Sequence, residues 1–498
     1  MTDQPAVSLP GKFPLSAFGL LLVLTCAAIA VHGYHLGIED EAIYLPAIKK
    51  LLNPQLYPHD AEFFMGQARG SALPLLVAYS VRATRIPLNW AVFGWQFASL
   101  YLMLLACFCV VRRCFAALRD QWGALTLVTA LLTLPVAGTG LYLADQHLHP
   151  RTLATAAILY SLSAALDRRI VATAASATAA FALHPLMAIF GISLVALIFL
   201  PMERWSSQAR PAFAMPFLSR PTAAWREAVA TREYYFLRNW QWYEWLGIFA
   251  PVVILWWFLG MAKRFHSPKF LLLAHRVVVF SILWFVAGMT ITVPRALEFL
   301  VPIQPMRYLH LVYLLMILFA GGFLAHFVLR GRLWRWVLLL LPICVGMFLA
   351  QRDLFSASSH IGWPLARHQN KWVAAFLWIR SNTPRDVYFA LDPRYMSLPG
   401  EENYGFRALA ERSQIADYSK DAAVVSVAPA LAQAWQQQVH ALDGFQDFTQ
   451  ADFRRLNQQF RVNMILLDQS KADSLATAGF DCPYRNELLA VCRVPPQH

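Results

Sequence analysis

The sequence predicts a polytopic α-helical membrane protein with a small α/β domain at its C-terminal end. Composition indicates this class, because 58% of the 498 residues are hydrophobic and only 14% are charged, against about 25% charged residues in soluble proteins. Apolar stretches of about 18 to 24 residues also recur along the chain. Each is long enough to cross the hydrocarbon layer of a bilayer as a helix that satisfies its own backbone hydrogen bonds.

About nine transmembrane helices are expected. The loops after the second, fourth, sixth and eighth stretches are rich in Arg and Lys, so the positive-inside rule places them, with the N-terminus, in the cytoplasm. The first outer loop (33–88) and everything after Gln351 then lie on the opposite side. The least regular stretch is 171–200, which His184 and Pro185 could divide into two short helices. The nine stretches are 15–32, 89–111, 124–143, 151–167, 171–200, 243–262, 271–293, 308–329 and 335–350.

Three domains follow from this pattern: a transmembrane domain (1–350), a linker (351–365) and a soluble α/β domain (366–498). In the last domain the helical stretch "KWVAAFLWIRSN" precedes strand-like runs "DVYFALD", "VNMILLD" and "LLAVCRV". Cys482 and Cys492 flank a terminal hairpin, and they can form a cross-strand disulfide if this domain faces an oxidising compartment.

The net charge of +13 does not indicate a nucleic-acid partner. Residues 351–498 contain 15 basic and 15 acidic residues, so the whole excess lies in residues 1–350. Much of it sits in short connections between apolar stretches, where membrane topology accounts for it.

The first outer loop contains three consecutive acids, Glu39, Asp40 and Glu41, close to the end of the first apolar stretch. An amphipathic pattern from Tyr44 to Leu52 follows and predicts a helix lying along the membrane surface. Carboxylates held there can act as a general base on a hydroxyl or bind a divalent metal. Asp40 is the first candidate for catalysis, with Glu39 or Glu41 assisting it. The alternative is that Glu41 caps the helix and the other two acids are solvated.

A second cluster, "DQHLHPR", contains Asp145, His147, His149 and Arg151 at an outer boundary. Its acid and histidines alternate, so they can share one side of an extended loop and bind substrate, relay a proton or ligate a metal together with Asp40. Asp145 is a second candidate for catalysis. The alternative is that the histidines are hydrogen-bonded interface residues.

Three further residues are candidates for substrate binding. Glu244 lies in the aromatic run "RNWQWYEWLG", which otherwise has the character of an aromatic belt. Arg295 and Arg307 lie at the outer ends of spans, where the positive-inside rule does not require cations, and each can clamp a phosphate through its planar guanidinium. Lipid headgroup binding, or pairing with Glu298, is the alternative.

These features together resemble the GT-C class of glycosyltransferases. The resemblance rests on "GIEDEAIY" in the first outer loop, the helix after it, "DQHLHPRTLA" in the next outer loop, and the soluble domain, in which "FLWIRSNTPRDVYFALDP" and "FRALAERSQIADY" are similar to openings of such domains in bacterial members. It implies inverting transfer of a hexosyl or pentosyl group from a polyprenyl-phosphate donor to a glycan, lipid or protein acceptor. It also implies a first-loop acid as base or metal ligand, with a divalent metal as an optional cofactor, at the outer face of a bacterial inner membrane.

Two alternatives come from other functional classes. A transporter or flippase of lipid-linked saccharides would place ionisable groups within spans near the bilayer midplane, whereas the expected spans carry few charges. A non-catalytic membrane scaffold would use the C-terminal domain to bind a partner.

Overall fold

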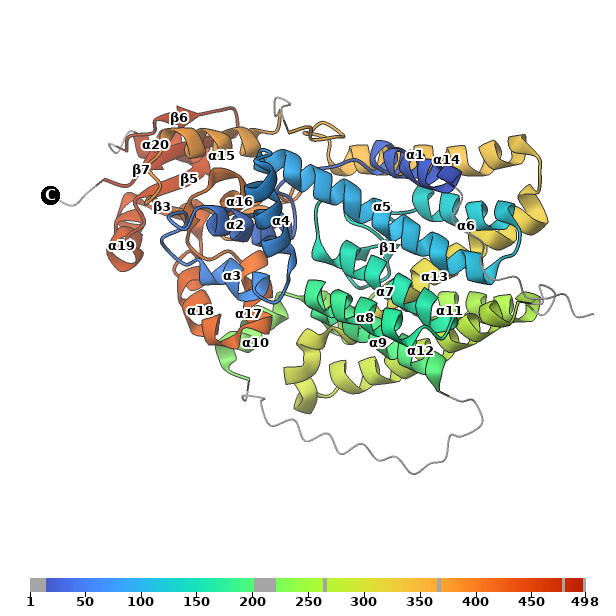
Figure 1. The fold of residues 1–498 in the computed structure, drawn as a ribbon. Helices are drawn as coiled ribbons and strands as arrows, with labels where there is room; N and C mark the ends of the chain where they lie inside the picture. Colours follow the sequence, from blue (N-terminus) through green and yellow to red (C-terminus); the bar gives the residue numbers. More distant parts are fainter. Residues whose placement is uncertain (1–14, 201–220, 263–266, 365–368, 477–479, 496–498) are drawn as a thin grey trace, which may run out of the picture.

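The computed structural model describes residues 15–200, 221–262, 267–364, 369–476 and 480–495, and it is largely helical (Figure 1). Among these residues, six helical segments are long and apolar enough to cross a membrane, which agrees with the expected membrane class. They are α1 (Leu15–His32), α5 (Leu88–Cys114), α11 (Trp242–Ala262), α12 (Pro268–Thr292), the segment Arg295–Leu329 that contains α13 (Leu309–Phe323), and α14 (Leu333–Leu354).

The predicted count of nine spans is not supported, and the stretch 124–143 shows one reason. Helix α6 (Leu118–Ala130) ends at Ala130, and the chain then forms the antiparallel hairpin of β1 (Pro135–Val136) and β2 (Leu141–Tyr142). Gly138 and Gly140 in the hairpin have φ of +61° and +65°, a conformation that glycine adopts without steric cost. Hydropathy alone did not reveal this break.

The other two predicted spans, 151–167 and 171–200, are not among the six segments either. Helix α7 (Pro150–Leu166) has 17 residues, and the stretch 171–200 is divided into α8 (Ile170–Leu183) and α9 (Pro185–Phe199). His184 between them has an extended backbone, and Pro185 has no N–H with which to continue α8. The division at His184 and Pro185 is the alternative that the sequence left open.

Helix α2 (Glu41–Leu52) follows the acidic triplet as expected, and it is covered by other parts of the chain. Its residues from Glu41 to Lys49 are buried, because α2 packs against α3 (Glu62–Ala68), α4 (Leu73–Thr84) and α16 (Phe406–Ala410). In Figure 1 the blue helices α2, α3 and α4 lie against the orange elements of the C-terminal region, which include α16.

The C-terminal region is α/β, as predicted. Its sheet has the strand order β4-β3-β5-β7-β6, in which β3 pairs in parallel with β4 and β5, and β7 pairs antiparallel with β5 and β6. Cys482 and Cys492 form the predicted disulfide. The strands are β3 (Tyr388–Ala390), β4 (Ser413–Gln414), β5 (Met464–Asp468), β6 (Tyr484–Arg485) and β7 (Leu489–Arg493), and the longer helices are α15 (Lys371–Asn382), α17 (Lys420–Val427), α18 (Ala432–His440), α19 (Gln450–Phe460) and α20 (Gln469–Ala476).

The C-terminal region is packed onto residues 33–88, the segment expected to form the first outer loop, which keeps this name below. The backbone N–H of Gly405 donates to the carbonyl of Gly37 at 2.8 Å, and the hydroxyl of Tyr57 donates to the carbonyl of Arg407 at 2.8 Å. The acidic triplet therefore lies at a junction between two regions that are more than 300 residues apart in the sequence.

Candidate functional site

The first two acids of the triplet line two adjoining cavities, which share Glu39, Asp40 and Arg151 in their walls. The hairpin cavity, of about 550 Å³, is bounded by the β1–β2 hairpin and by Asp145, His147 and Glu244. The cationic cavity, of about 450 Å³, is bounded by His149, His184, Arg232, Gln304, Arg307 and Lys420. A ligand in either cavity can therefore reach the same carboxylates.

Glu39 and Asp40 share a lysine from the C-terminal region. The Lys420 ammonium donates to Glu39 Oε2 at 2.7 Å and to Asp40 Oδ1 at 3.0 Å, while Asn403 donates to the other oxygen of Glu39. Burial would raise the pKa of Asp40, but Lys420 and His149 outweigh burial and hold this pKa well below its usual value. The Asp40 side chain is still 31% exposed, so an ionised carboxylate faces the cavities.

Glu41 points away from both cavities. Its side chain accepts from the backbone N–H of Gly37 at 2.5 Å and from that of Leu148 at 2.9 Å. Burial raises its pKa to about 8. Glu41 therefore joins the first outer loop to the "DQHLHPR" loop, and the structure does not bring it to the site with Glu39 and Asp40.

His149 is held against Asp40. Its Nδ1 accepts from the backbone N–H of Arg151 at 3.0 Å, which caps α7, and its Nε2 lies 3.2 Å from Asp40 Oδ2. Because Nδ1 accepts, the proton of the neutral ring lies on Nε2 and points at Asp40. Burial is the main cause that lowers the pKa of His149 to about 4, so the ring is neutral at physiological pH.

Asp145 and His147 line the hairpin cavity, and both have buried polar atoms without a hydrogen-bond partner. Asp145 Oδ1 accepts from Arg151 at 2.6 Å, but its Oδ2 and both ring nitrogens of His147 are buried without a hydrogen-bond partner. Burial would raise the pKa of Asp145, yet Arg151 and the two histidines lower it to about 2. A buried polar atom without a partner is costly, so this wall is suited to a polar ligand such as a sugar or another hydroxyl compound.

Two arginines line the cationic cavity, and each also carries buried nitrogens without a hydrogen-bond partner. Nε and Nη2 of Arg232 and Nε of Arg307 are buried and have no hydrogen-bond partner. Both side chains are partly exposed and line the cavity beside Lys420. The exposed part of each guanidinium group lies where it can contact a phosphate or a carboxylate in the cavity.

The remaining predicted residues divide between these cavities and other places. Glu244 lines the hairpin cavity, and its carboxylate accepts from the backbone N–H of Gln241 at 2.7 Å. Arg295 lines a separate cavity of about 240 Å³, so it does not join Arg307. Glu298 pairs with Arg226 at 2.6 Å, not with Arg295 as the alternative interpretation supposed.

Asp40, Asp145, His147 and His149 are the residues for which the sequence predicts metal binding. Among the described residues, no group of three or more His, Cys, Asp or Glu side chains is placed to hold one. Both nitrogens of His149 are engaged, one Asp145 oxygen binds Arg151, and Lys420 lies against Asp40. Metal binding thus stays a prediction of the sequence.

Sequence reasoning missed Lys420 and Arg232. Lys420 is 380 residues from Asp40, and nothing in its local pattern marks it as a partner of the triplet. Arg232 carried a weak signal, because it is a cation on the expected outer side, like Arg295 and Arg307. The fold alone gathers these cations around the acids.

Comparison with known proteins finds no matching family model and no matching curated protein.

Proposed function

We propose that this protein is a membrane glycosyltransferase that transfers a sugar from a polyprenyl-phosphate donor to a hydroxyl acceptor. The observation that carries the proposal is the placement of the ionised Asp40 between a cavity lined by the cations Arg232, Arg307 and Lys420 and a cavity lined by the polar groups of Asp145, His147 and Glu244. One side suits the phosphate of a donor, and the other suits a polar acceptor.

The donor lies with its phosphate in the cationic cavity. Arg232, Arg307 and Lys420 supply positive charge there, which stabilises the phosphate dianion that leaves during transfer. Leu183 and Leu186 of the broken α8–α9 stretch also line this cavity. They offer an apolar path by which an isoprenyl chain reaches the bilayer while its phosphate stays at the site.

The acceptor lies in the hairpin cavity, where Asp145, His147 and Glu244 bind its hydroxyl groups. Its attacking oxygen forms a bond to the anomeric carbon as the bond from that carbon to the phosphate oxygen breaks, and Asp40 takes the hydroxyl proton. A carboxylate of low pKa is a weak base. It suffices here because the hydroxyl becomes strongly acidic once its oxygen bonds to the electron-poor carbon.

The test is sugar transfer by the purified full-length protein in lipid nanodiscs. A panel of polyprenyl-phosphate monosaccharides is supplied with a membrane extract as acceptor, and release of polyprenyl phosphate is measured. Asp40→Asn should abolish release without lowering expression. Glu62→Gln is the matched control, because Glu62 belongs to the same loop and pairs on the surface with Arg69. Unchanged turnover of Asp40→Asn removes Asp40 from the mechanism.

The proposal also requires the first outer loop and the C-terminal region to share the extracytoplasmic side of the membrane, with the N-terminus in the cytoplasm. The contacts between Gly37 and Gly405, and between Tyr57 and Arg407, support a shared side. A reporter enzyme fused after residue 366 tests on which side of the membrane the C-terminal region lies. A cytoplasmic signal would contradict the extracytoplasmic assignment.

A further inference from the structure

The cation between Glu39 and Asp40 is an amino-acid side chain of the C-terminal region. Lys420 is the first residue of α17, its side chain is only 11% exposed, and its ammonium lies within 3.0 Å of both carboxylates. Burial would lower the pKa of Lys420, but Asp40 and Glu39 outweigh it and raise this pKa. The lysine is therefore charged at the position between two acids where a metal ion could otherwise bind.

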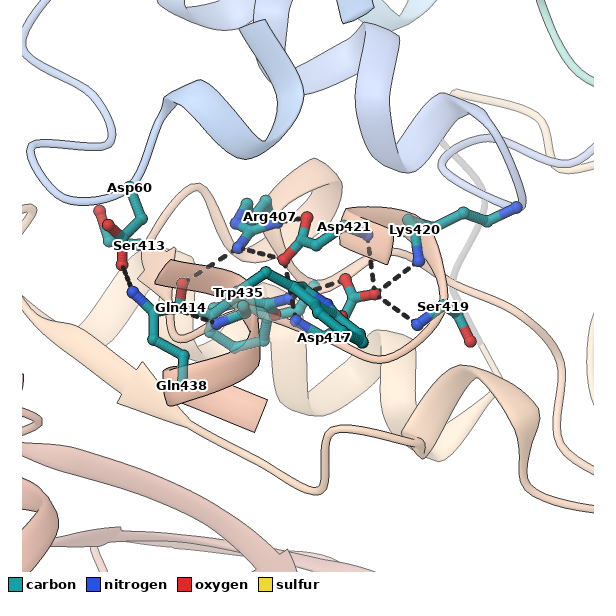
Figure 2. Close-up of polar contacts among 12 residues, drawn as sticks. Asp60, Arg407, Ser413, Gln414, Asp417, Ser419, Lys420, Asp421, Trp435 and Gln438 are labelled. Atoms are coloured by element: carbon teal, nitrogen blue, oxygen red, sulfur yellow. Dashed lines mark hydrogen bonds and ion pairs between the residues drawn. The ribbon is translucent and has the colours of Figure 1, made fainter. Parts of the chain in front are cut away.

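The backbone of Lys420 is fixed by a buried aspartate. Asp417 Oδ1 accepts from the backbone N–H groups of Ser419, Lys420 and Asp421, at 2.9, 2.5 and 3.1 Å, and the Trp435 indole donates to the Asp417 carbonyl at 2.9 Å (Figure 2). Three donors on one carboxylate oxygen leave the first turn of α17 little freedom. These hydrogen bonds therefore fix the direction in which the Lys420 side chain projects from the helix.

A buried ion pair ties this turn to the first outer loop. Arg407 donates to both oxygens of Asp421, at 2.7 and 2.9 Å, and the two side chains are 4% and 1% exposed. The carbonyl of Arg407 in turn accepts from Tyr57 of the outer loop. Buried ion pairs add little net stability, and their best attested use is to fix one arrangement of the chain. Here that arrangement places the Lys420 ammonium against Glu39 and Asp40.

Lysine has three N–H donors, and the two carboxylates take two of them. The third is available to the cationic cavity, which Lys420 lines together with Arg232 and Arg307. A phosphate in that cavity would thus meet an ammonium that also holds the two acids in place. Such a charge-assisted contact is about twice as strong as a neutral hydrogen bond.

We propose that Lys420 is a positioning residue that bridges the Glu39–Asp40 pair to an anionic isoprenyl phosphate in the cationic cavity, so that the C-terminal region completes the site. The identity of the ligand rests on the proposed function, whereas the bridge between Lys420 and the acids rests on the contacts alone. The ammonium separates the two carboxylates, fixes the orientation of Asp40 and adds positive charge beside the phosphate.

The first experiment measures binding of citronellyl phosphate, a short isoprenyl phosphate, to the full-length protein in nanodiscs. Lys420→Met should raise the Kd by about tenfold to a hundredfold, because one charge-assisted hydrogen bond is lost. Lys420→Arg should recover most of the affinity, since it keeps the cation. Lys49→Met is the matched control, because Lys49 also joins the first outer loop to the C-terminal region, through Glu411 at 2.7 Å, and lines neither cavity.

Two results of this experiment would overturn the proposal: wild-type affinity in Lys420→Met, or an equal loss of affinity in Lys49→Met. The latter would mean that docking of the C-terminal region, and not the ammonium, determines binding. If the wild-type protein itself does not bind citronellyl phosphate, the proposed function fails, and a second experiment without ligand decides the role of Lys420.

The second experiment compares thermal unfolding of Lys420→Met in two backgrounds. The drop in Tm should be reduced by at least about half in the Glu39→Gln/Asp40→Asn background, because the ammonium then has no carboxylates to pair with. Equal drops in the two backgrounds would show that Lys420 is not coupled to the acids, and would overturn the bridge whatever the ligand is.

Discussion

Replacement of Glu41 by Gln should change how the stability of the protein depends on pH. Glu41 is 1% exposed and accepts from the N–H groups of Gly37 and Leu148 with its two separate oxygens. A Gln side chain has one acceptor oxygen, and its NH₂ group cannot accept. One buried N–H therefore loses its partner, which costs about 1–3 kcal/mol.

The titration of Glu41 sets the direction of the pH effect. Burial raises its pKa in the folded protein from 4.5 to about 8. Between these values the unfolded chain has released the proton and the folded chain keeps it, so the stabilising effect present below pH 4.5 is lost as the pH rises toward 8. At about 1.36 kcal/mol per pKa unit, the full loss is on the order of 5 kcal/mol.

The assay is the apparent Tm in detergent from pH 5 to pH 8.5, measured for the wild type, Glu41→Gln and Asp40→Asn. The wild type should exceed Glu41→Gln at pH 5, and its advantage should shrink or reverse by pH 8.5. The difference in Tm between the wild type and Asp40→Asn should not change with pH. The pKa of Asp40 lies well below its usual value, so this group does not titrate between pH 5 and pH 8.5. A difference in Tm between the wild type and Glu41→Gln that does not change with pH would show that the pKa of Glu41 is not raised in the folded protein.

Three further predictions concern stability. Arg407→Met should destabilise the protein by about 3–5 kcal/mol in denaturant unfolding, because it leaves Asp421 buried without its partner. Adding Asp421→Leu should recover most of this loss; no recovery would contradict the ion-pair account. Asp145→Asn should lower Tm more at pH 7 than at pH 3, because the stability due to the ionised carboxylate is lost as the pH falls toward a pKa of about 2. The same drop in Tm at both pH values would contradict this prediction. Reduction of the Cys482–Cys492 disulfide, which closes a short loop with a sequence separation of 10, should cost about 2–3 kcal/mol, and an unchanged Tm in reductant would argue against it.

The sequence was most informative for structural features that depend on residues close together in the chain. The acidic triplet, the helix after it, the α/β character of the C-terminal region and the pairing of Cys482 with Cys492 all follow from local composition and spacing. The hairpin within 124–143 did not, because Leu131 to Tyr142 is apolar enough to resemble the end of a span. Its unwinding depends on Pro135 and on the positive φ of two glycines.

The candidate site was predicted only in part. Glu39, Asp40, Asp145 and His147 line the cavities as a site would require, but consecutive residues point in different directions, and the sequence could not tell which acid turns away. Contacts with Gly37 and Leu148 decide that it is Glu41.

The cationic half of the site depends on tertiary packing. Lys420 reaches Asp40 only because the C-terminal region docks on the first outer loop, which no local pattern encodes.

The placement of the donor phosphate beside Lys420 can be seen directly in an experimental structure of the full-length protein in nanodiscs with an isoprenyl phosphate bound. Phosphorus density is expected in the cationic cavity, in contact with Arg232, Arg307 and Lys420, with an isoprenyl chain that leaves past Leu183 and Leu186 toward the bilayer. Phosphorus density at the separate cavity of Arg295, with the acids facing solvent alone, would contradict this placement.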